Sequence, residues 1–395
     1  MTTDFVPRSA HTSGGHRIGM VSTYPPKLCG LATFAAALEN ALRQADNYVG
    51  IVEIQEGASA ISLSGRFPQV VGQLVNGSAD SVRRAAATLS QYDVAIVQHE
   101  FGIFGGCDGN EALALIAEIR VPVIVVLHTV PVGPTPNQQF VLESLARLAD
   151  RVIVMTEAAK SRLLALFDVS AGKVATIAHG AIVPNNRQRH LDTRPGERPR
   201  LLTWGLLGPG KGIEHVIDSL ALLADIVPAP QYTVAGVTHP KVFERDGERY
   251  RQSLAQRATH RCVSSSVAFD ETYRDVASLT RFVAASDVVI LPYDSRDQVT
   301  SGVLVDAIAA GRPVIATAFP HAVEMLASGA GIVVPHGDPG AMAAAIRTLL
   351  TTPGRLQRAT LEAQRIAPSL SWSSIAQHYL SIVDDVLGSM AAVAS

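Results

Sequence analysis

Residues 201–214 read Leu-Leu-Thr-Trp-Gly-Leu-Leu-Gly-Pro-Gly-Lys-Gly-Ile-Glu, an apolar run that passes through a glycine-rich turn into a helical pattern. A short apolar run bounded by glycines predicts a buried strand, and the glycines allow the backbone to turn sharply at its carboxyl end. The same succession recurs along the chain, because short Val/Ile-rich runs alternate with amphipathic segments. This alternation predicts βαβ units and a parallel sheet, so the fold class is α/β.

Two sets of strands are predicted, one in each half of the chain. The first set falls at residues 17–22, 49–54, 93–98, 121–127, 151–155 and 173–178. The second set falls at residues 201–204, 232–237, 263–269, 288–291, 314–316 and 332–334. Helices are expected after the last strand, near residues 341–350, 356–366 and 373–387.

The two sets predict two doubly wound domains in tandem. The polar stretch at residues 185–198 has the composition of a linker. We therefore assign residues 1–186 to the first domain, joined by the C-terminal helix at about 373–390, and residues 199–372 to the second. Such domains bind ligands at the carboxyl ends of their strands, where the strand order reverses. We expect the two domains to face each other across a cleft that holds the site.

Composition excludes several classes of protein. Of 395 residues, 47% are hydrophobic and 17% are charged, which excludes a disordered chain. The longest apolar run, residues 121–127, is far shorter than the roughly 20 residues that span a bilayer. The polar first 16 residues lack a signal-peptide core, which favours a cytoplasmic protein. A net charge of −2 argues against nucleic acid as a partner, while peripheral contact with a membrane stays open.

The glycine-rich turn of the second half suits a phosphate group. Gly205, Gly208 and Gly210 precede Lys211, so an ammonium and backbone N–H groups would meet phosphate oxygens together at the start of a helix. It is not a Walker P-loop, because no Ser or Thr follows the lysine. The alternative is a glycine-rich loop with an exposed lysine.

A second polar turn follows the predicted strand at 288–291. Thr300, Ser301 and Gly302 suit an anion at a helix N-terminus. Gln298 and Asp306, eight positions apart, could hold hydroxyl groups of a sugar or ribose. A plain N-cap is the alternative interpretation.

Strand ends of the first half carry further candidates. Gly30 opens a helix and would let the backbone approach a ligand, but the G-x-G-x-x-G fingerprint is absent, which disfavours a nicotinamide enzyme. His128 follows an apolar strand. His99 and Glu100 end another strand, and the glycine-rich loop at 102–109 could line an acceptor pocket.

No metal and no bound cofactor is expected. The histidines lack i, i+4 spacing, and the three cysteines lie far apart. No Asp-x-Asp occurs in the chain, which removes the usual carboxylate pair for magnesium on a nucleotide sugar. The chemistry should therefore be independent of metal.

Together these motifs resemble those of retaining GT-B glycosyltransferases of family 4, over residues 19–387. The turn at Gly30 is similar to the family's first glycine loop, and His128 to its strand-end histidine. Residues 205–212 are similar to the family's G-R-x4-KG segment, and residues 298–306 to its E-x7-E segment. The phrases GLL-x3-KGIE and Q-x-TSG-x-L look closest to a mannosyltransferase-like subgroup.

The sequence departs from the family pattern at three positions. Leu206 stands where the family usually has a phosphate-binding arginine, and Gln298 and Asp306 replace the two glutamates. Lys211 would therefore carry the diphosphate without its usual partner.

The resemblance implies that a hexosyl unit moves, with retention, from a nucleotide sugar to a hydroxyl of a sugar or oligosaccharide acceptor. GDP-mannose is the favoured donor. The implied catalytic residues are His128, Lys211 and Gln298. The implied donor-binding residues are Gly30, Gly205, Gly208, Gly210, Phe269, Thr300, Ser301, Gly302 and Asp306, with Phe269 as a wall for the base, and His99 and Glu100 would bind the acceptor.

Rival interpretations remain open. UDP-glucose is the alternative donor to GDP-mannose. Leu206 and Gln298, which replace charged residues, favour a non-catalytic nucleotide-sugar-binding protein. A sugar-nucleotide epimerase or a two-carboxylate glycosidase should place acidic pairs at strand ends, and few are evident.

Overall fold

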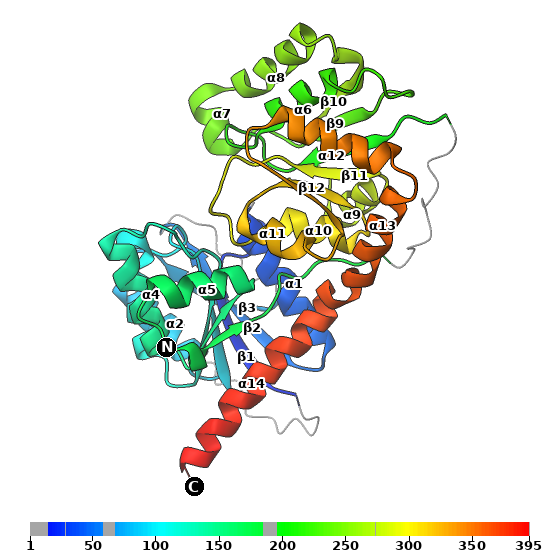
Figure 1. The fold of residues 1–395 in the computed structure, drawn as a ribbon. Coiled ribbons are helices and arrows are strands. Elements are labelled where there is room, and N and C mark those ends of the chain that lie inside the picture. The colour runs from blue at the N-terminus through cyan, green and yellow to red at the C-terminus, as the bar shows by residue number, and fades with distance from the viewer. Residues whose placement is uncertain (1–14, 28, 58–67, 185–195, 273, 395) are drawn as a thin grey trace. The chain divides into compact units, whose positions relative to one another are not determined.

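The computed structural model describes residues 15–27, 29–57, 68–184, 196–272 and 274–394. The chain divides into two compact units (Figure 1). The first unit contains the described residues up to Val154, Arg162–Ile177 and those from Ile375 onward, and the second contains Met155–Ser161 and Ala178–Ser374. Most of the predicted linker at 185–198 lies outside the described residues.

The first unit is built on a seven-stranded parallel sheet with the order β3-β2-β1-β4-β5-β6-β7. The strands are β1 (Arg17–Ser22), β2 (Tyr48–Gln55), β3 (Val70–Val75), β4 (Val94–His99), β5 (Val123–Leu127), β6 (Arg151–Val154) and β7 (Val174–Thr176). The order reverses between β1 and β4, which is where a doubly wound sheet opens to a ligand.

One strand of this sheet, β3, was missed by the sequence analysis. It lies at the edge of the sheet, and Gly72 and Gln73 interrupt its apolar run. The register against β2 shifts between Ile51 and Val52. An edge strand buries fewer side chains, so its sequence lacks the continuous apolar signal of a central parallel strand.

Helices of the first unit begin at recognisable caps. In α4, Thr135 and Gln138 form a capping box and Pro136 occupies the first turn. The C-terminal helix α14 contacts the start of β1 through His16 and Asp384, whose Nε2 and Oδ1 lie 2.7 Å apart. The helices are α1 (Gly30–Gln44), α2 (Ala79–Leu89), α3 (Glu111–Glu118) and α4 (Pro136–Leu148), with 3₁₀ turns η1 (Cys107–Gly109) and η2 (Ala171–Lys173). Two further helices, α5 (Glu157–Leu166) and α14 (Trp372–Ala394), begin in residues of the second unit and continue in the first.

The second unit is built on a six-stranded parallel sheet with the order β10-β9-β8-β11-β12-β13. The strands are β8 (Arg200–Trp204), β9 (Gln231–Ala235), β10 (Val267–Asp270), β11 (Val288–Leu291), β12 (Val314–Thr317) and β13 (Gly331–Val334). The order reverses between β8 and β11. Two Rossmann-like, doubly wound domains are therefore confirmed.

Helices cover both faces of the second sheet (Figure 1). Alternate strand residues point to opposite faces, so Leu201 and Val288 join one core while Leu202 and Val289 join the other. The first core includes residues of α6 (Ile213–Ala221), α8 (Arg249–His260) and α12 (Pro339–Thr351). The second includes residues of α9 (Val276–Ala284), α10 (Gly302–Ala309), α11 (Pro320–Leu326) and α13 (Arg355–Ile366).

Smaller departures from the predicted elements have local causes. The strand predicted at 263–269 begins only at Val267, because Ser264–Ser266 forms the 3₁₀ turn η3. The remaining elements are the helix α7 (Pro240–Asp246) and the 3₁₀ turn η4 (Ala367–Leu370). Within the described ranges, no helix combines the length and the apolar character needed to cross a bilayer.

Candidate functional site

Two loops meet where the strand order of the second sheet reverses. One follows β8 and contains residues 205–212, and the other follows β11 and leads to α10. The backbone N–H of Asp294 donates to the carbonyl of Gly210 at 3.0 Å, which ties the two loops together. Both loops that the sequence analysis linked to phosphate therefore lie at the carboxyl ends of neighbouring strands of the same sheet.

The loop after β8 requires glycine at defined positions. Gly205, Gly210 and Gly212 have φ of 129°, 88° and 65°, which favour glycine. A Cβ on Gly212 would lie 1.8 Å from the carbonyl oxygen of Pro292, so even alanine would collide with backbone. Gly208 is less restricted, because a Cβ there would meet the flexible side chain of Val242 at 3.2 Å.

The ammonium of Lys211 is held against an aromatic ring. Its Nζ lies 4.7 Å from the centroid of the Tyr293 ring. Burial lowers the pKa of Lys211, and no neighbouring carboxylate offsets that effect. A partly buried ammonium with no ion pair among the described carboxylates has the chemistry to bind an external anion.

The N-terminus of α10 is partly engaged within the protein. Ser301 is the N-cap, and its hydroxyl accepts from the N–H of Leu304 at 3.3 Å. The N–H of Ser301 donates to Nδ1 of His321 at 2.8 Å. This amide is therefore committed to His321, which corrects the expectation that the N–H groups of Thr300, Ser301 and Gly302 all serve an anion.

Two histidines support this helix end, the buried His321 and the half-buried His179. Burial, with a smaller effect of His179, lowers the pKa of His321 to about 3, so its ring is neutral and Nδ1 can accept. Burial also lowers the pKa of His179 to about 4. A Cβ on Gly302 would lie 3.1 Å from Nε2 of His179, so glycine allows the ring to approach. From the sequence, His321 had no role beyond a possible sugar contact, and its bond to Ser301 could not be predicted because the two lie 20 positions apart.

The predicted sugar and ribose contacts lie around the same helix. The Nε2 of Gln298 donates to the carbonyl of Thr300 at 3.0 Å, so the side chain is held beside the helix start. Asp306 lies on α10, where burial raises the pKa of its carboxyl to about 7. Phe269, the predicted wall for the base, is on the edge strand β10 and packs partly against the core.

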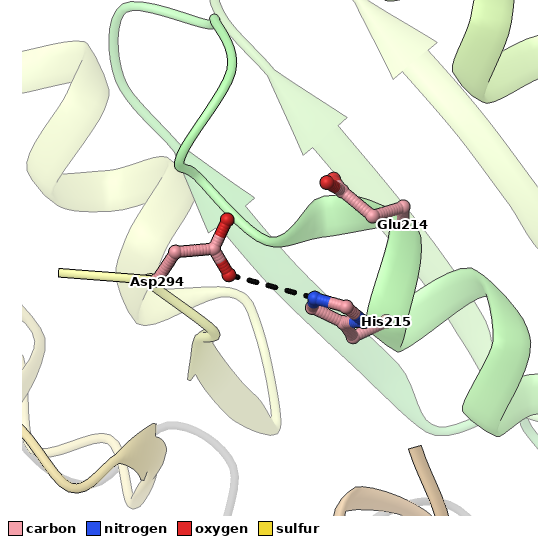
Figure 2. A group of neighbouring side chains, drawn as sticks. All are labelled: Glu214, His215 and Asp294. Atoms are coloured by element: carbon pink, nitrogen blue, oxygen red, sulfur yellow. Dashed lines mark ion pairs between the residues drawn. The ribbon is translucent and has the colours of Figure 1, made fainter. Parts of the chain in front are cut away.

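An acidic and histidine cluster adjoins the glycine loop (Figure 2). Glu214, His215 and Asp294 bring potential ligand atoms within 4.8 Å of one another. The Nε2 of His215 lies 3.4 Å from Oδ1 of Asp294. The sequence analysis expected no such grouping, because Asp294 reaches it from the loop after β11. These three residues are the place where a divalent cation could bind.

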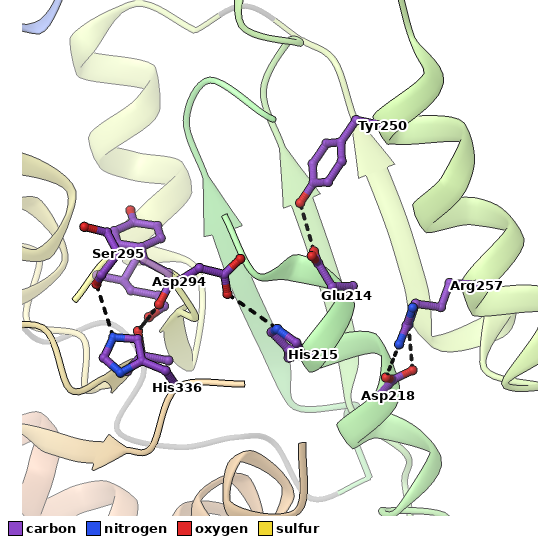
Figure 3. Close-up of polar contacts among 11 residues, drawn as sticks. Glu214, His215, Asp218, Tyr250, Arg257, Asp294, Ser295 and His336 are labelled. Carbon is purple, nitrogen blue, oxygen red and sulfur yellow. Dashed lines mark hydrogen bonds and ion pairs between the residues drawn. The ribbon is translucent and has the colours of Figure 1, made fainter. Parts of the chain in front are cut away.

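Further polar contacts hold this cluster in place, as Figure 3 shows. The hydroxyl of Tyr250 donates to Oε2 of Glu214 at 3.0 Å, and burial together with the Glu214 charge raises the pKa of Tyr250. The Nε2 of His336 lies 3.1 Å from the carbonyl oxygen of Ser295. The first contact joins α8 to α6, and the second restricts the loop that contains Asp294.

The first unit places its candidates at the ends of β1, β4 and β5. The Nε2 of His128 lies 2.7 Å from Oε1 of Gln98 on β4, and the ring meets Phe34 edge-on at 4.9 Å. This orientation is held by two side chains. Gly30 opens α1, and a Cβ there would meet no atom within 4 Å, so the position is open.

The two predicted acceptor residues differ in exposure. His99 is 0% exposed, and neither ring nitrogen has a hydrogen bond to the described residues. Its ring contacts Phe101 and Phe104, and burial lowers its pKa to about 3. His99 therefore offers no surface to an acceptor. Glu100 is half-buried, and its carboxylate accepts from the Thr129 hydroxyl and the Phe101 N–H.

Comparisons with known proteins agree with this geometry. Residues 29–182 match the family model described as Glycosyltransferase Family 4, and residues 198–352 match the model described as Glycosyl transferases group 1. HepE of Anabaena, solved in complex with UDP, superposes with a TM-score of 0.73 at 19% identity, over 93% of this chain and all of that one.

Curated relatives are similar to this chain over most of its length. Glycogen synthase of Mycobacterium tuberculosis is 24% identical over 68% of this chain, and the match spans 64% of that protein's length. D-inositol 3-phosphate glycosyltransferase 1 of Catenulispora acidiphila is 26% identical over 80% of this chain and 76% of its own length.

Each half of the chain thus matches a glycosyltransferase model, and the paired Rossmann-like sheets are those of the GT-B fold. The chain therefore contains two segments of glycosyltransferase-family type within a GT-B fold.

Proposed function

We propose that this protein transfers a hexosyl unit from a nucleoside diphosphate sugar to a hydroxyl of a sugar or oligosaccharide acceptor, with retention and without a metal. The observation that carries this proposal is the Lys211 ammonium, which lies over the Tyr293 ring without an ion-pair partner among the described carboxylates. It follows a loop whose glycines have positive φ, so backbone N–H groups accompany the charge.

The chemistry needs charge stabilisation more than a dedicated nucleophile. A departing diphosphate accumulates negative charge while the sugar becomes oxocarbenium-like, and fixed dipoles and an ammonium stabilise that separation. Lys211 and the loop at 205–212 serve the diphosphate in this scheme. Gln298 holds sugar hydroxyls, Asp306 the ribose, and His128 the sugar near its anomeric carbon.

Two donors are supported by different observations. The sequence motifs GLL-x3-KGIE and Q-x-TSG-x-L, which resemble those of a mannosyltransferase-like subgroup, favour GDP-mannose. HepE has been solved with UDP-glucose, which favours UDP-glucose as the second candidate. The relatives named D-inositol 3-phosphate glycosyltransferase support a hydroxylated acceptor. A cytoplasmic location remains the expectation from the sequence.

A donor panel tests the proposal on the intact chain. We expect GDP-mannose or UDP-glucose to raise the melting temperature at concentrations well above Kd, because ligand binding stabilises by mass action. The same donor should then be consumed with an oligosaccharide acceptor, and the anomeric configuration of the product read by NMR. Absence of any shift across GDP, UDP and ADP sugars contradicts the proposal, and binding without transfer indicates a non-catalytic binder.

Metal independence has its own test. Turnover should survive excess EDTA, and His215→Ala, which removes one member of the Glu214, His215 and Asp294 group, should leave the EDTA response unchanged. One result would contradict this part of the proposal: EDTA abolishes the activity of the unmodified protein and manganese restores it, whereas manganese does not restore activity in His215→Ala.

A further inference from the structure

Tyr293 is a buried tyrosine just past the end of β11. Only 4% of its surface is exposed, and its ring stacks on Phe319 with centroids 5.5 Å apart. Its backbone carbonyl accepts from the Thr317 hydroxyl at 2.6 Å. The ring is therefore fixed in position by its neighbours on both the backbone and the side chain.

One face of this ring carries the Lys211 ammonium, at 4.7 Å from Nζ to the centroid. A cation over a ring face is attracted by the ring quadrupole, most strongly where water is excluded. At position 206, where an arginine would add a second cation, the chain has Leu206, which is 40% exposed. The aromatic ring is thus what steadies the one lysine of this loop.

The same tyrosine lies in the second loop, between β11 and α10, whose N-cap is Ser301. The next residue, Asp294, donates its N–H to the carbonyl of Gly210. Residues 293 and 294 therefore contact the glycine loop through the Tyr293 ring and the Asp294 backbone.

We propose that Tyr293 is a positioning residue for the diphosphate site: its ring holds the Lys211 ammonium in place beside the glycine loop. The inference rests on the proposed function for the identity of the anion. Tyr293 acts through Lys211, and its own atoms need not touch the donor.

The ring and ammonium geometry can be tested without any substrate. The chain has five lysines, so lysine labelled with ¹³C at Cε gives few NMR signals, and Lys211→Arg identifies that of Lys211. Protons above an aromatic face are shielded. We expect a shielded Lys211 signal in the unmodified protein and in Tyr293→Phe, and its loss in Tyr293→Leu.

Nucleotide binding gives the functional readout. Calorimetry with UDP and with GDP should show about tenfold weaker binding for Tyr293→Leu, corresponding to loss of a desolvated cation–π contact. Tyr293→Phe keeps the ring and should stay within about threefold of the unmodified protein. Tyr232→Phe is the matched control for loss of a buried tyrosine hydroxyl, since this hydroxyl donates to Thr203 and lies away from Lys211 in the hydrogen-bond pattern.

Each outcome decides a different question. If the unmodified protein binds neither nucleotide, the proposed function fails and this role fails with it. If it binds and Tyr293→Leu binds equally well, the positioning role alone is overturned. Should Tyr293→Leu not fold, the NMR signal decides, because an unshielded Lys211 in the unmodified protein or in Tyr293→Phe overturns the proposal.

Discussion

At the scale of single residues, Lys211 brings a cation to a partly buried place where no described carboxylate pairs with it. Lys211→Ala should therefore fold normally, since it removes a charge that burial disfavours. In turnover it should lose about 3 kcal/mol of transition-state stabilisation, or 100-fold or more in kcat. Steady-state kinetics with one identified donor measure this, and a near-normal kcat would mean that backbone dipoles alone hold the diphosphate.

The exposed Leu206 offers a rescue of that variant. An arginine there would restore a second cation to the loop, if its side chain turns toward the phosphates as the family resemblance implies. Adding Leu206→Arg to Lys211→Ala should recover about tenfold of the lost kcat. Leu206→Met, which adds length without charge, is the control, and equal recovery by both would contradict an electrostatic effect.

Asp306 predicts a pH dependence of stability. Burial raises its pKa from 3.8 to about 7, so the native state holds a proton that the unfolded state releases between these values. Stability should fall as the pH rises through this window and then level off. The side chain of Asp306→Asn stays neutral at every pH. The melting temperature of this variant should therefore be about 3 °C or more above that of the unmodified protein at pH 8, and the two should be equal at pH 4. Equal melting at both pH values would contradict the raised pKa.

At the scale of elements, the loop after β8 provides a matched pair of glycines. Gly210 and Gly212 both have positive φ, but only at Gly212 would a Cβ meet backbone, the Pro292 carbonyl oxygen at 1.8 Å. Gly210→Ala should cost about 1 kcal/mol of unfolding free energy, and Gly212→Ala about 3 kcal/mol. Urea unfolding measures both losses of free energy. Equal losses would show that the loop backbone moves to accommodate the added Cβ at Gly212.

Elements with continuous local signals were the predictable part of this fold. Central parallel strands are buried on both faces, so β4, β5 and β11 appear as apolar runs. The edge strand β3 buries fewer side chains and contains Gly72, so its run was too broken to recognise. Neither strand order could be predicted, because pairing depends on contacts between distant segments.

The candidate site likewise contains local features that the sequence could predict and long-range contacts that it could not. The positive φ values around Lys211 could be anticipated, because a glycine turn is a local feature. The contact of Ser301 with His321 and the approach of Asp294 to His215 could not, because each joins separate loops. His99 shows the converse failure: it ends a strand as predicted, yet the pleat turns its side chain into the core.

At the scale of the whole molecule, the two units carry different candidates. Both loops suited to phosphate belong to the second unit, whereas His128 belongs to the first. If the nucleotide binds to the second unit alone, changes in the first should spare nucleotide affinity and still impair transfer. Nucleotide affinity and transfer can both be measured on variants of the intact chain, so the two units need not be expressed separately.

His128→Ala and Lys211→Ala together test this division. We expect His128→Ala to bind UDP or GDP within about twofold of the unmodified protein, and to lose about 100-fold in kcat because a positioned contact with the sugar is gone. Lys211→Ala should weaken both binding and turnover. His128→Asn, which keeps a hydrogen-bonding group near Gln98, separates lost contact from lost packing against Phe34. Nucleotide affinity that falls as far in His128→Ala as in Lys211→Ala would refute a donor site confined to the second unit.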